Sequence, residues 1–408
     1  MSERPRGERA LVLLIAAVQL VNVLDFVMVM PLGPDFAAGL GIPASKLGLI
    51  SGSYTAAAAA SGLLGSLFLD RFDRRPALGI AMLGLVLGTA LGGTARDLST
   101  LLGARLLAGF FGGPATSLSF SIVADVVPEA RRGAALGFVM GAFSVAAVLG
   151  VPAGLELARH LGWRAPFFAV AALGALVAVT AVLLLPPLRG HLAADARRVA
   201  LSGLFTSREV LLSWTMTFLV MAAGFALIPN LSAFVQFNLG YPRAKLGLLY
   251  FAGGCVSFVA TQISGRLVDR FGSFRVGTAG SALLIFTIVT GFAMAPPLLP
   301  VLGIFMLFML AMALRNVAYH TLTSKVPRGS ERARFMSIQS AVQHGASAAG
   351  AFLSSQMLSE LPGGALAGMG RVAATAVALT LTLPFMLFRV ESAVQRRAPV
   401  LPAGQVPQ

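Results

Sequence analysis

The chain has 408 residues, of which 57% are hydrophobic and only 12% are charged, whereas a soluble domain carries about 25% charged residues. This composition excludes a soluble protein of this size, because so few charges could not cover its surface. It also excludes a disordered chain, because apolar residues are abundant. The remaining class is a membrane protein with many helical spans of about 20 residues each.

Twelve apolar runs follow one another along the chain, and each is long enough to cross a bilayer as a helix. They cover residues 11–31, 47–68, 77–94, 100–123, 134–155, 166–186, 210–235, 246–267, 277–295, 299–322, 335–358 and 370–389. The alternating pattern of β-barrel strands is absent from these runs. The sequence therefore predicts an all-α membrane protein with twelve transmembrane helices.

Basic residues give the chain a formal net charge of +15, and they are concentrated in every second connection between the runs. Loops rich in Lys and Arg stay in the cytoplasm, so we expect both termini to be cytoplasmic. A bacterial inner (plasma) membrane is the expected location. Nucleic-acid binding is not expected, because the basic residues are dispersed among loops. The single cysteine, Cys255, lies in an apolar run and is expected to be a core residue.

The two halves of the chain repeat each other. Asp70-Arg71-Phe72 recurs as Asp269-Arg270-Phe271, and the segment KLGL of residues 46–49 recurs at residues 245–248, at one constant offset. Six runs separate the copies, so both copies face the same way across the bilayer. We expect two six-helix bundles related by a pseudo-twofold axis. The predicted division is 1–189 for the first bundle, 190–209 for a cytoplasmic central loop, and 210–408 for the second bundle with a short tail.

The loops after the second and eighth runs carry the strongest local motif. One reads SLFLDRFDRR over residues 66–75, and the other reads GRLVDRFGSFR over residues 265–275. Both resemble the G-x-x-x-D-R-x-G-R-[KR] signature of the major facilitator superfamily. The span count, the internal repeat and the long central connection resemble that superfamily over the whole chain.

The resemblance implies a conformational latch at the cytoplasmic ends of the bundles. It would face Asp70 toward the start of the eleventh run and Asp269 toward the start of the fifth run, because an acid favours a helix N-terminus. Asp125 is a candidate partner for Arg71 or Arg74. The residues assigned to this latch are Asp70, Arg71, Arg74, Asp125, Gly265, Asp269 and Arg270. The alternative is that the arginines only set topology and touch lipid phosphates.

Asp25 is the only acidic residue well inside a predicted span, in a segment LDFVMVMP that resembles the first-span motif of proton-coupled exporters. Arg105 lies at a similar depth in the fourth run, in LLGARLLAG, which is similar to the family's L-x-x-x-R-x-x-x-G pattern. Burial disfavours a charged carboxyl and a nearby arginine favours it, so this pair is expected to couple transport to protons, with Arg105 facing the central cavity. The alternatives are a structural hydrogen bond for Asp25 and snorkelling of Arg105 to headgroups.

Two further polar faces are expected at the substrate cavity, because the first, fourth, seventh and tenth spans line it in the family. Gln19 and Asn22 share a helix face with Asp25 in the first run, and the tenth run carries a second cluster. The cavity residues predicted are Gln19, Asn22, Arg315, Asn316, Tyr319 and His320, with Gln343 and His344 as weaker candidates. Arg315 would suit an anionic group, or it could snorkel to headgroups. A neutral, hydrogen-bonded His320 is favoured over a titrating one.

Gly150, Pro152 and Gly154 form a motif in the fifth run that resembles the antiporter motif of exporters, in the form found in the sugar-efflux branch. Glycines let helices pack closely and a proline opens a kink. Packing alone is the alternative explanation for these glycines.

The function expected is proton-coupled antiport that exports small organic molecules, drug-like or sugar-like, by alternating access. The alternative is an importer or facilitator of a small metabolite, neutral or anionic, on the same fold. An enzyme is not expected, because the chain shows no nucleophile constellation, paired carboxylates or phosphate loop. No cofactor and no metal site are expected. The expected partners are a small-molecule substrate, protons and the lipid bilayer, and the family implies a monomer.

Overall fold

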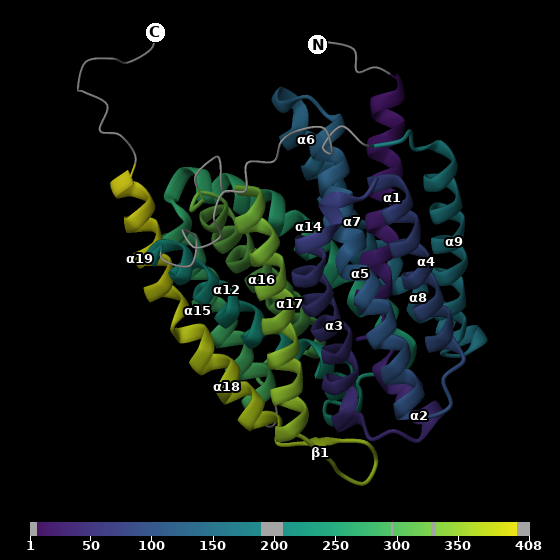
Figure 1. Ribbon diagram of the computed structural model, residues 1–408. Coiled ribbons are helices and arrows are strands. Elements are labelled where there is room, and N and C mark those ends of the chain that lie inside the picture. The colour runs from purple at the N-terminus through teal and green to yellow at the C-terminus, as the bar shows by residue number, and fades with distance from the viewer. Residues whose placement is uncertain (1–5, 189–206, 295–296, 328–331, 398–408) are drawn as a thin grey trace.

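The computed structural model describes residues 6–188, 207–294, 297–327 and 332–397. Almost all of these residues are helical (Figure 1). We call the end at which α1 begins and α19 ends the upper end, as it is drawn in Figure 1, and the opposite end the lower end. Eleven described helical segments are long and apolar enough to cross a membrane.

The helices of the first half start and finish near the predicted runs. They are α1 (Arg6–Met28), α2 (Gly33–Leu40), α3 (Leu47–Phe68), α4 (Arg74–Gly93), α5 (Leu98–Val126), α6 (Glu129–Met140), α7 (Ala142–Val145), α8 (Val151–Leu161) and α9 (Ala165–Leu184). A π-helical turn, Ala146–Gly150, joins α7 to α8, so that α6, α7 and α8 together make the fifth span.

The second half repeats this arrangement with one addition. Its elements are α12 (Arg208–Leu227), α13 (Leu231–Ala233), α14 (Leu246–Phe271), α15 (Ser273–Ile288), α16 (Val301–Ser324), α17 (Arg332–Met357), β1 (Ser359–Glu360), β2 (Leu366–Ala367), α18 (Met369–Leu381) and α19 (Leu383–Arg397). The strands form a small antiparallel hairpin in which Ser359 pairs with Ala367. The helix α2 and this hairpin, both at the lower end (Figure 1), were not predicted from the sequence.

The eleventh span is α17, whose composition is too polar to qualify by apolarity among the described helices. It carries Gln339, Gln343 and His344 in its middle. The helix lies between α12 of its own half and α3 of the other half. Polar side chains are tolerated in a span when they meet other helices instead of lipid. The twelve-helix architecture predicted from the runs is therefore present.

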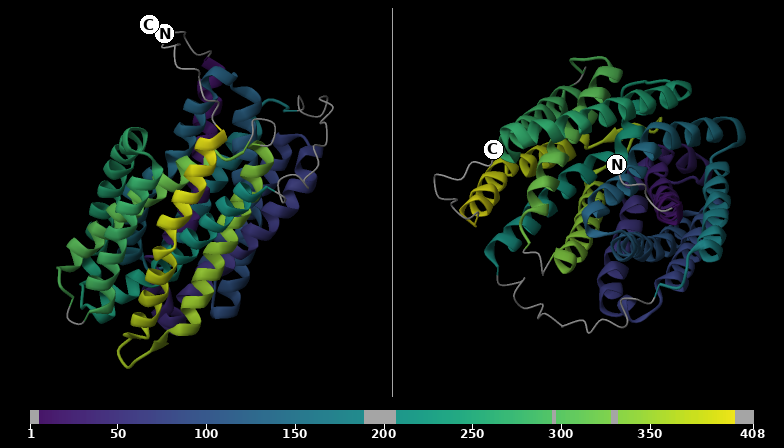
Figure 2. Two further views of the ribbon diagram at one scale, coloured as in Figure 1. Left: turned by 90° about the vertical axis from the view of Figure 1, so that its left-hand side faces the viewer. Right: turned by 90° about the horizontal axis from the view of Figure 1, so that it is seen from above.

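The two halves form two groups of helices that lie side by side when seen from above (Figure 2, right). In the first group α4 packs on α5 and α9, while α3 packs on α5; in the second group α16 packs on α14 and α15, while α12 packs on α17. The groups meet along α3 and α17, and again where α8 and its π-helical turn meet α14. Large apolar side chains on outer helices such as α9 are exposed, Leu184 by 71%, as expected where lipid covers the protein.

Candidate functional site

A fully buried ion pair lies inside the first bundle. The guanidinium Nη1 of Arg105 on α5 donates to Oδ1 and Oδ2 of Asp25 on α1 at 2.9 and 3.1 Å, and Nη2 reaches the backbone carbonyl of Asp25 at 3.3 Å. Asp25 is 0% exposed and Arg105 is 1% exposed. Two charges in a low-dielectric interior hold each other strongly, because neither has water as an alternative partner.

Two neighbouring side chains complete this arrangement. The hydroxyl of Thr89 on α4 lies 2.8 Å from Oδ1 of Asp25, and also 2.8 Å from the carbonyl of Leu85. The guanidinium of Arg105 lies over the ring of Tyr54 on α3, at 4.6 Å from its centroid. Sequence reasoning missed both residues, because a lone Thr and a lone Tyr in apolar runs are common. The pair therefore ties together α1, α3, α4 and α5.

Asn22 lies one turn from Asp25 and faces the same helices. Its amide oxygen accepts from the Tyr54 hydroxyl at 2.8 Å, and its amide nitrogen donates to the carbonyl of Gly112 at 3.0 Å and to Thr116 at 2.6 Å. A Cβ at Gly112 would meet the Tyr54 hydroxyl and Asn22 itself, so only glycine allows this approach. Gln19 is also buried, and its Oε1 has no partner among the described residues.

The expectation that Arg105 faces an open cavity is wrong. Its side chain points into the bundle, and the polar face of Gln19, Asn22 and Asp25 is covered by α3, α4 and α5 instead of forming an open wall. The reason is the glycine-rich surface of α5, where Gly109 and Gly112 bring α3 so close that Tyr54 covers the guanidinium.

The tenth-span cluster lies in the second bundle on α16. Arg315 and Tyr319 are both 0% exposed. The Tyr319 hydroxyl is 2.7 Å from Nε2 of the exposed His320 and accepts from Gln343 of α17 at 3.1 Å. Within the described residues, the guanidinium of Arg315 contacts the thioether of Met312 at 3.1 Å and the side-chain oxygen of Asn316 at 3.3 and 3.4 Å. The structure thus brings the predicted residues together, although Arg315 points into the bundle.

The latch residues lie at the upper end, and one ion pair between them is seen within the described side chains. Nε of Arg74 donates to Asp125 at 2.5 Å, so of the two candidates it is Arg74 that meets this acid, while Arg71 is exposed. The side chain of Asp70 lies outside the described residues, as do the first side chains of α17 that it was expected to face.

In the copy of this loop in the second half, the Glu391 carboxylate of α19 accepts from the backbone N–H groups of Ser273 and Phe274. Asp269 and Arg270 are exposed, the guanidinium of Arg270 lies over Phe271, and Gly265 borders open space. Asp269 makes no ion pair with any described residue. The expected meeting of Asp269 with the fifth span is therefore not seen within the described residues.

The glycines of the fifth span act in packing. A Cβ at Gly150 would collide with Leu24 of α1, and one at Gly154 would lie 3.2 Å from Met28. Pro152 stands at the start of α8, directly after the π-helical turn. These residues bring the fifth span against α1, next to Asp25.

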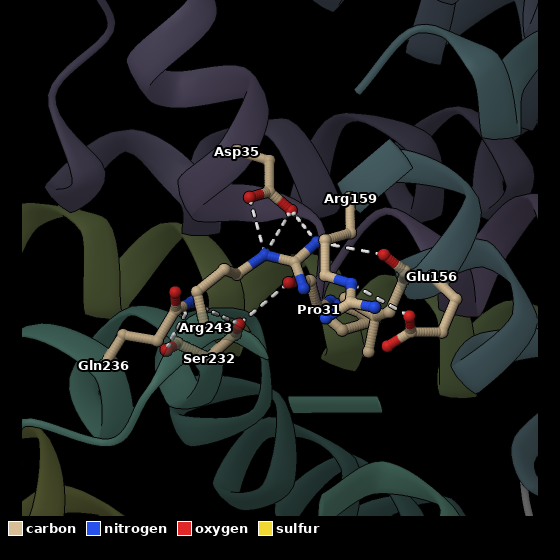
Figure 3. A network of polar contacts seen from close by, with 8 residues as sticks. Pro31, Asp35, Glu156, Arg159, Ser232, Gln236 and Arg243 are labelled. Atoms are coloured by element: carbon tan, nitrogen blue, oxygen red, sulfur yellow. Dashed lines mark hydrogen bonds and ion pairs between the residues drawn. The ribbon is translucent and has the colours of Figure 1, made fainter. Parts of the chain in front are cut away.

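A polar network at the lower end joins the two bundles (Figure 3). Arg243, just before α14, makes a forked ion pair with Asp35 of α2, with distances of 2.6 to 3.0 Å, and donates to the carbonyl of Leu155 at 3.2 Å. Ser232 donates to the carbonyl of Pro31 at 2.8 Å. The carboxylate of Glu360 in β1 accepts from the backbone N–H of Ala44.

Every hydrogen bond or ion pair found between the two bundles among the described residues lies at this lower end. The structure is therefore closed there. The sequence analysis did not predict the pair of Asp35 and Arg243. The sequence shows only that an acid and a base lie outside the predicted spans of opposite halves, which does not place them in contact.

Comparisons with known proteins agree with this architecture. Residues 15–351 match the Major Facilitator Superfamily. The chain is 29% identical to the chloramphenicol resistance protein of Streptomyces lividans over 67% of this chain and 70% of that protein. It is 26% identical to the uncharacterized MFS-type transporter YtbD of Bacillus subtilis, and that match spans 64% of this chain and 65% of the relative.

Solved structures show the same fold. A D-xylose-proton symporter superposes with a TM-score of 0.74 at 18% identity, covering 94% of this chain and 97% of that one. A bacterial homologue of the human lysosomal transporter Spinster, in an inward-facing and unoccupied conformation, has a TM-score of 0.73 at 17% identity, covering 96% and 98%. The chain is a membrane transporter that belongs to the Major Facilitator Superfamily.

Proposed function

We propose that this transporter is a proton-coupled antiporter that exports small organic molecules, with Asp25 as the proton carrier. The observation that carries the proposal is that Asp25 is the only acidic side chain that is buried among the described residues, and that it is paired with a buried arginine. Ionisable groups at this depth are expensive, and they mark ion pathways more often than structural contacts.

Protonation of Asp25 has a direct mechanical consequence. A neutral carboxyl no longer balances Arg105, so the bonds that tie α1 to α5 weaken together. Phe26, the next residue, stacks on Tyr54 at 5.3 Å between ring centroids and on Phe225 of the second bundle at 5.8 Å. A shift of α1 is therefore passed across the bundle interface at the depth where the proton binds.

The upper end is the cytoplasmic end in this proposal, because the loops there are rich in Lys and Arg. The structure then represents a state that is closed toward the outside. In the cycle, an outside proton binds Asp25 as substrate leaves, and the protonated carrier turns inward and releases the proton. A charge that crosses 100 mV yields about 2.3 kcal/mol, which supports about fortyfold accumulation of a neutral substrate per proton.

The similarity to a chloramphenicol resistance protein supports export over import. Chloramphenicol is therefore the first substrate to try. Inverted membrane vesicles with an imposed pH gradient also determine the direction, because an exporter accumulates substrate inside them, a coupled importer drives preloaded substrate out, and a facilitator only equilibrates it.

The test is the substitution Asp25→Asn, which keeps the size of the side chain and removes its titration. We expect proton-driven uptake into inverted vesicles to be lost while the amount of inserted protein is unchanged. The matched control is Asp97→Asn, because Asp97 is an exposed acid at the lower end of α5. Undiminished proton-driven uptake by Asp25→Asn contradicts the role of Asp25.

A further inference from the structure

The fourth and tenth spans each bury an arginine, Arg105 on α5 and Arg315 on α16, and within the described residues only Arg105 of this pair has a counter-charge. Arg105 is bound by the carboxylate of Asp25. Arg315 is 0% exposed, and no described acidic residue contacts it. Its Nη1 has no hydrogen-bond partner among the described residues. A guanidinium cannot release its proton at any ordinary pH, so the charge of Arg315 has to be balanced in some other way.

The internal repeat shows where the balancing group is missing. Arg105 and Asp25 stand on the fourth and first spans, and Arg315 and Gly224 stand on the tenth and seventh spans, α16 and α12. Gly224 occupies the repeat position of Asp25. A Cβ built on Gly224 would lie 3.4 Å from Nη2 of Arg315. The second bundle therefore has a cation next to this position, although Ile304 and not Arg315 is the repeat counterpart of Arg105, and it has no carboxylate there.

The present partners of Arg315 are poor ones for a charge. A thioether sulfur is a weak acceptor, and the contacts to the side-chain oxygen of Asn316 are long, at 3.3 and 3.4 Å. Hydrogen bonds between a guanidinium and a carboxylate are about twice as strong as those between neutral groups. Replacing the sulfur by a carboxylate is therefore favourable, because it also neutralises a charge in a low-dielectric interior.

We propose that Arg315 is the binding site for the carboxylate of a small organic molecule, which occupies the place of the missing acid beside Gly224. The proposal rests on the proposed function in taking this molecule to be a transported substrate, and it adds small organic anions or zwitterions to the substrate class beside neutral molecules. Around this position, the side chains of Asn316, Tyr319, His320 and Gln343 offer hydrogen bonds to the remainder of such a molecule.

Met312 controls access to the guanidinium. Its Cε lies 3.3 Å from the Cβ position of Gly224, and its sulfur accepts from Nη2 of Arg315. Its side chain is only half-buried. Methionine is unbranched and flexible, so it can swing away and open the space between α12 and α16 without moving a helix.

The experiment measures thermal unfolding of the purified full-length protein in detergent. The probes are benzoate and acetate, each compared with its neutral amide, benzamide or acetamide, at constant ionic strength. We expect the carboxylates to raise the unfolding temperature of the wild type and the amides to leave it unchanged. Arg315→Gln is expected to weaken benzoate binding by at least about tenfold.

A matched pair of variants separates charge from shape. Gly224→Asp places a carboxylate beside Arg315, so it is expected to raise the unfolding temperature without ligand relative to Gly224→Asn, and to abolish the response to benzoate. Asp25→Asn is expected to keep the benzoate response, because Asp25 lies in the other bundle. Failure of proton coupling and failure of the anion site are thus distinguishable.

Two results would overturn the proposal. One is a wild-type protein that carboxylates stabilise no more than their amides do. The other is stabilisation by chloride at the same concentration that equals the effect of benzoate and acetate, which would show that Arg315 takes an inorganic ion.

Discussion

At the scale of single residues, glycine decides how the buried ion pair is enclosed. A Cβ at Gly109 would meet the backbone of Tyr54, whereas Gly103 on the same helix has nothing within 4 Å of the corresponding position. Tyr54 in turn covers the guanidinium of Arg105. The ion pair of Asp25 and Arg105 is therefore enclosed only when α3 and α5 pack closely together.

We expect Gly109→Ala to destabilise the protein by about 1–3 kcal/mol, because the added methyl group overpacks the contact with Tyr54. Gly103→Ala is the matched control and should cause no loss, since alanine favours a helix over glycine. Thermal unfolding in detergent measures both. Equal unfolding temperatures for the two variants would contradict this account of the contact.

Sequence reasoning reached some of these residues and not others for a physical reason. Asp25 and Arg105 stand out in the sequence because a charge in an apolar run is costly. Their similar depths in two spans predicted that they form a pair. The residues Thr89 and Tyr54 carry no such cost. Asp73 and Gly272 occupy the same position of the repeated motif but differ in backbone conformation. Gly272 has a φ of 85°, in the left-handed region, whereas Asp73 has a φ of −58°. A motif match therefore does not predict the conformation of this turn.

At the scale of elements, the hydrophobic runs predicted spans well because apolar length is what the bilayer selects. The second run, 47–68, coincides with α3 (Leu47–Phe68). The π-helical turn before α8 was not predicted, because it depends on how the glycines of that span meet Leu24 of α1. The short helix α2 has too few residues to show a period.

The first turn of α5 provides a prediction about pH. Asp97 caps this helix by accepting from the backbone N–H of Thr100 at 2.8 Å and from its hydroxyl at 3.0 Å. These bonds, led by the one from the backbone, lower the pKa of Asp97 below its ordinary value of 3.8. The cap therefore stabilises the turn above about pH 3.8, and this stabilisation is lost as the pH falls further through the folded pKa.

Hydrogen exchange of the first turn of α5 checks this effect. We expect exchange in the wild type, relative to Asp97→Asn, to accelerate when the pH is lowered through this range. Asparagine caps a helix about as well as aspartate but does not titrate. A constant ratio between the two proteins would show that the charge of Asp97 plays no part.

At the scale of the whole molecule, the polar contacts seen between the two bundles within the described part of the chain lie at the lower end. Arg243 and Asp35 are each about a quarter exposed, and their forked geometry makes the pair stronger than an ordinary surface pair. The internal repeat predicted the two bundles, but no repeat predicts which end is closed. A transporter samples several arrangements of the same bundles, and small differences in free energy decide among them.

We expect Arg243→Gln to open the lower end in a larger fraction of molecules, by about fivefold if the pair contributes about 1 kcal/mol. Distances between spin labels at cysteines introduced at Ser99 and Leu361, in a Cys255→Ala background, report this population. Arg159→Gln is the control, since Arg159 pairs with Glu156 within α8 and does not join the bundles. Identical distance distributions for the two variants would rule out Arg243 as a closing contact.

The polar composition of α17 has a consequence for how the molecule is made. A segment with two glutamines and a histidine at its centre gains little by leaving the translocon for lipid on its own. Its stable place depends on α12 and α3, which precede it in the order of synthesis and lie on either side of it. The position between α3 and α12 must therefore stay unoccupied until this helix is synthesised. A chain truncated before α17 should still insert its earlier spans, but the interface between its two halves should remain incompletely packed.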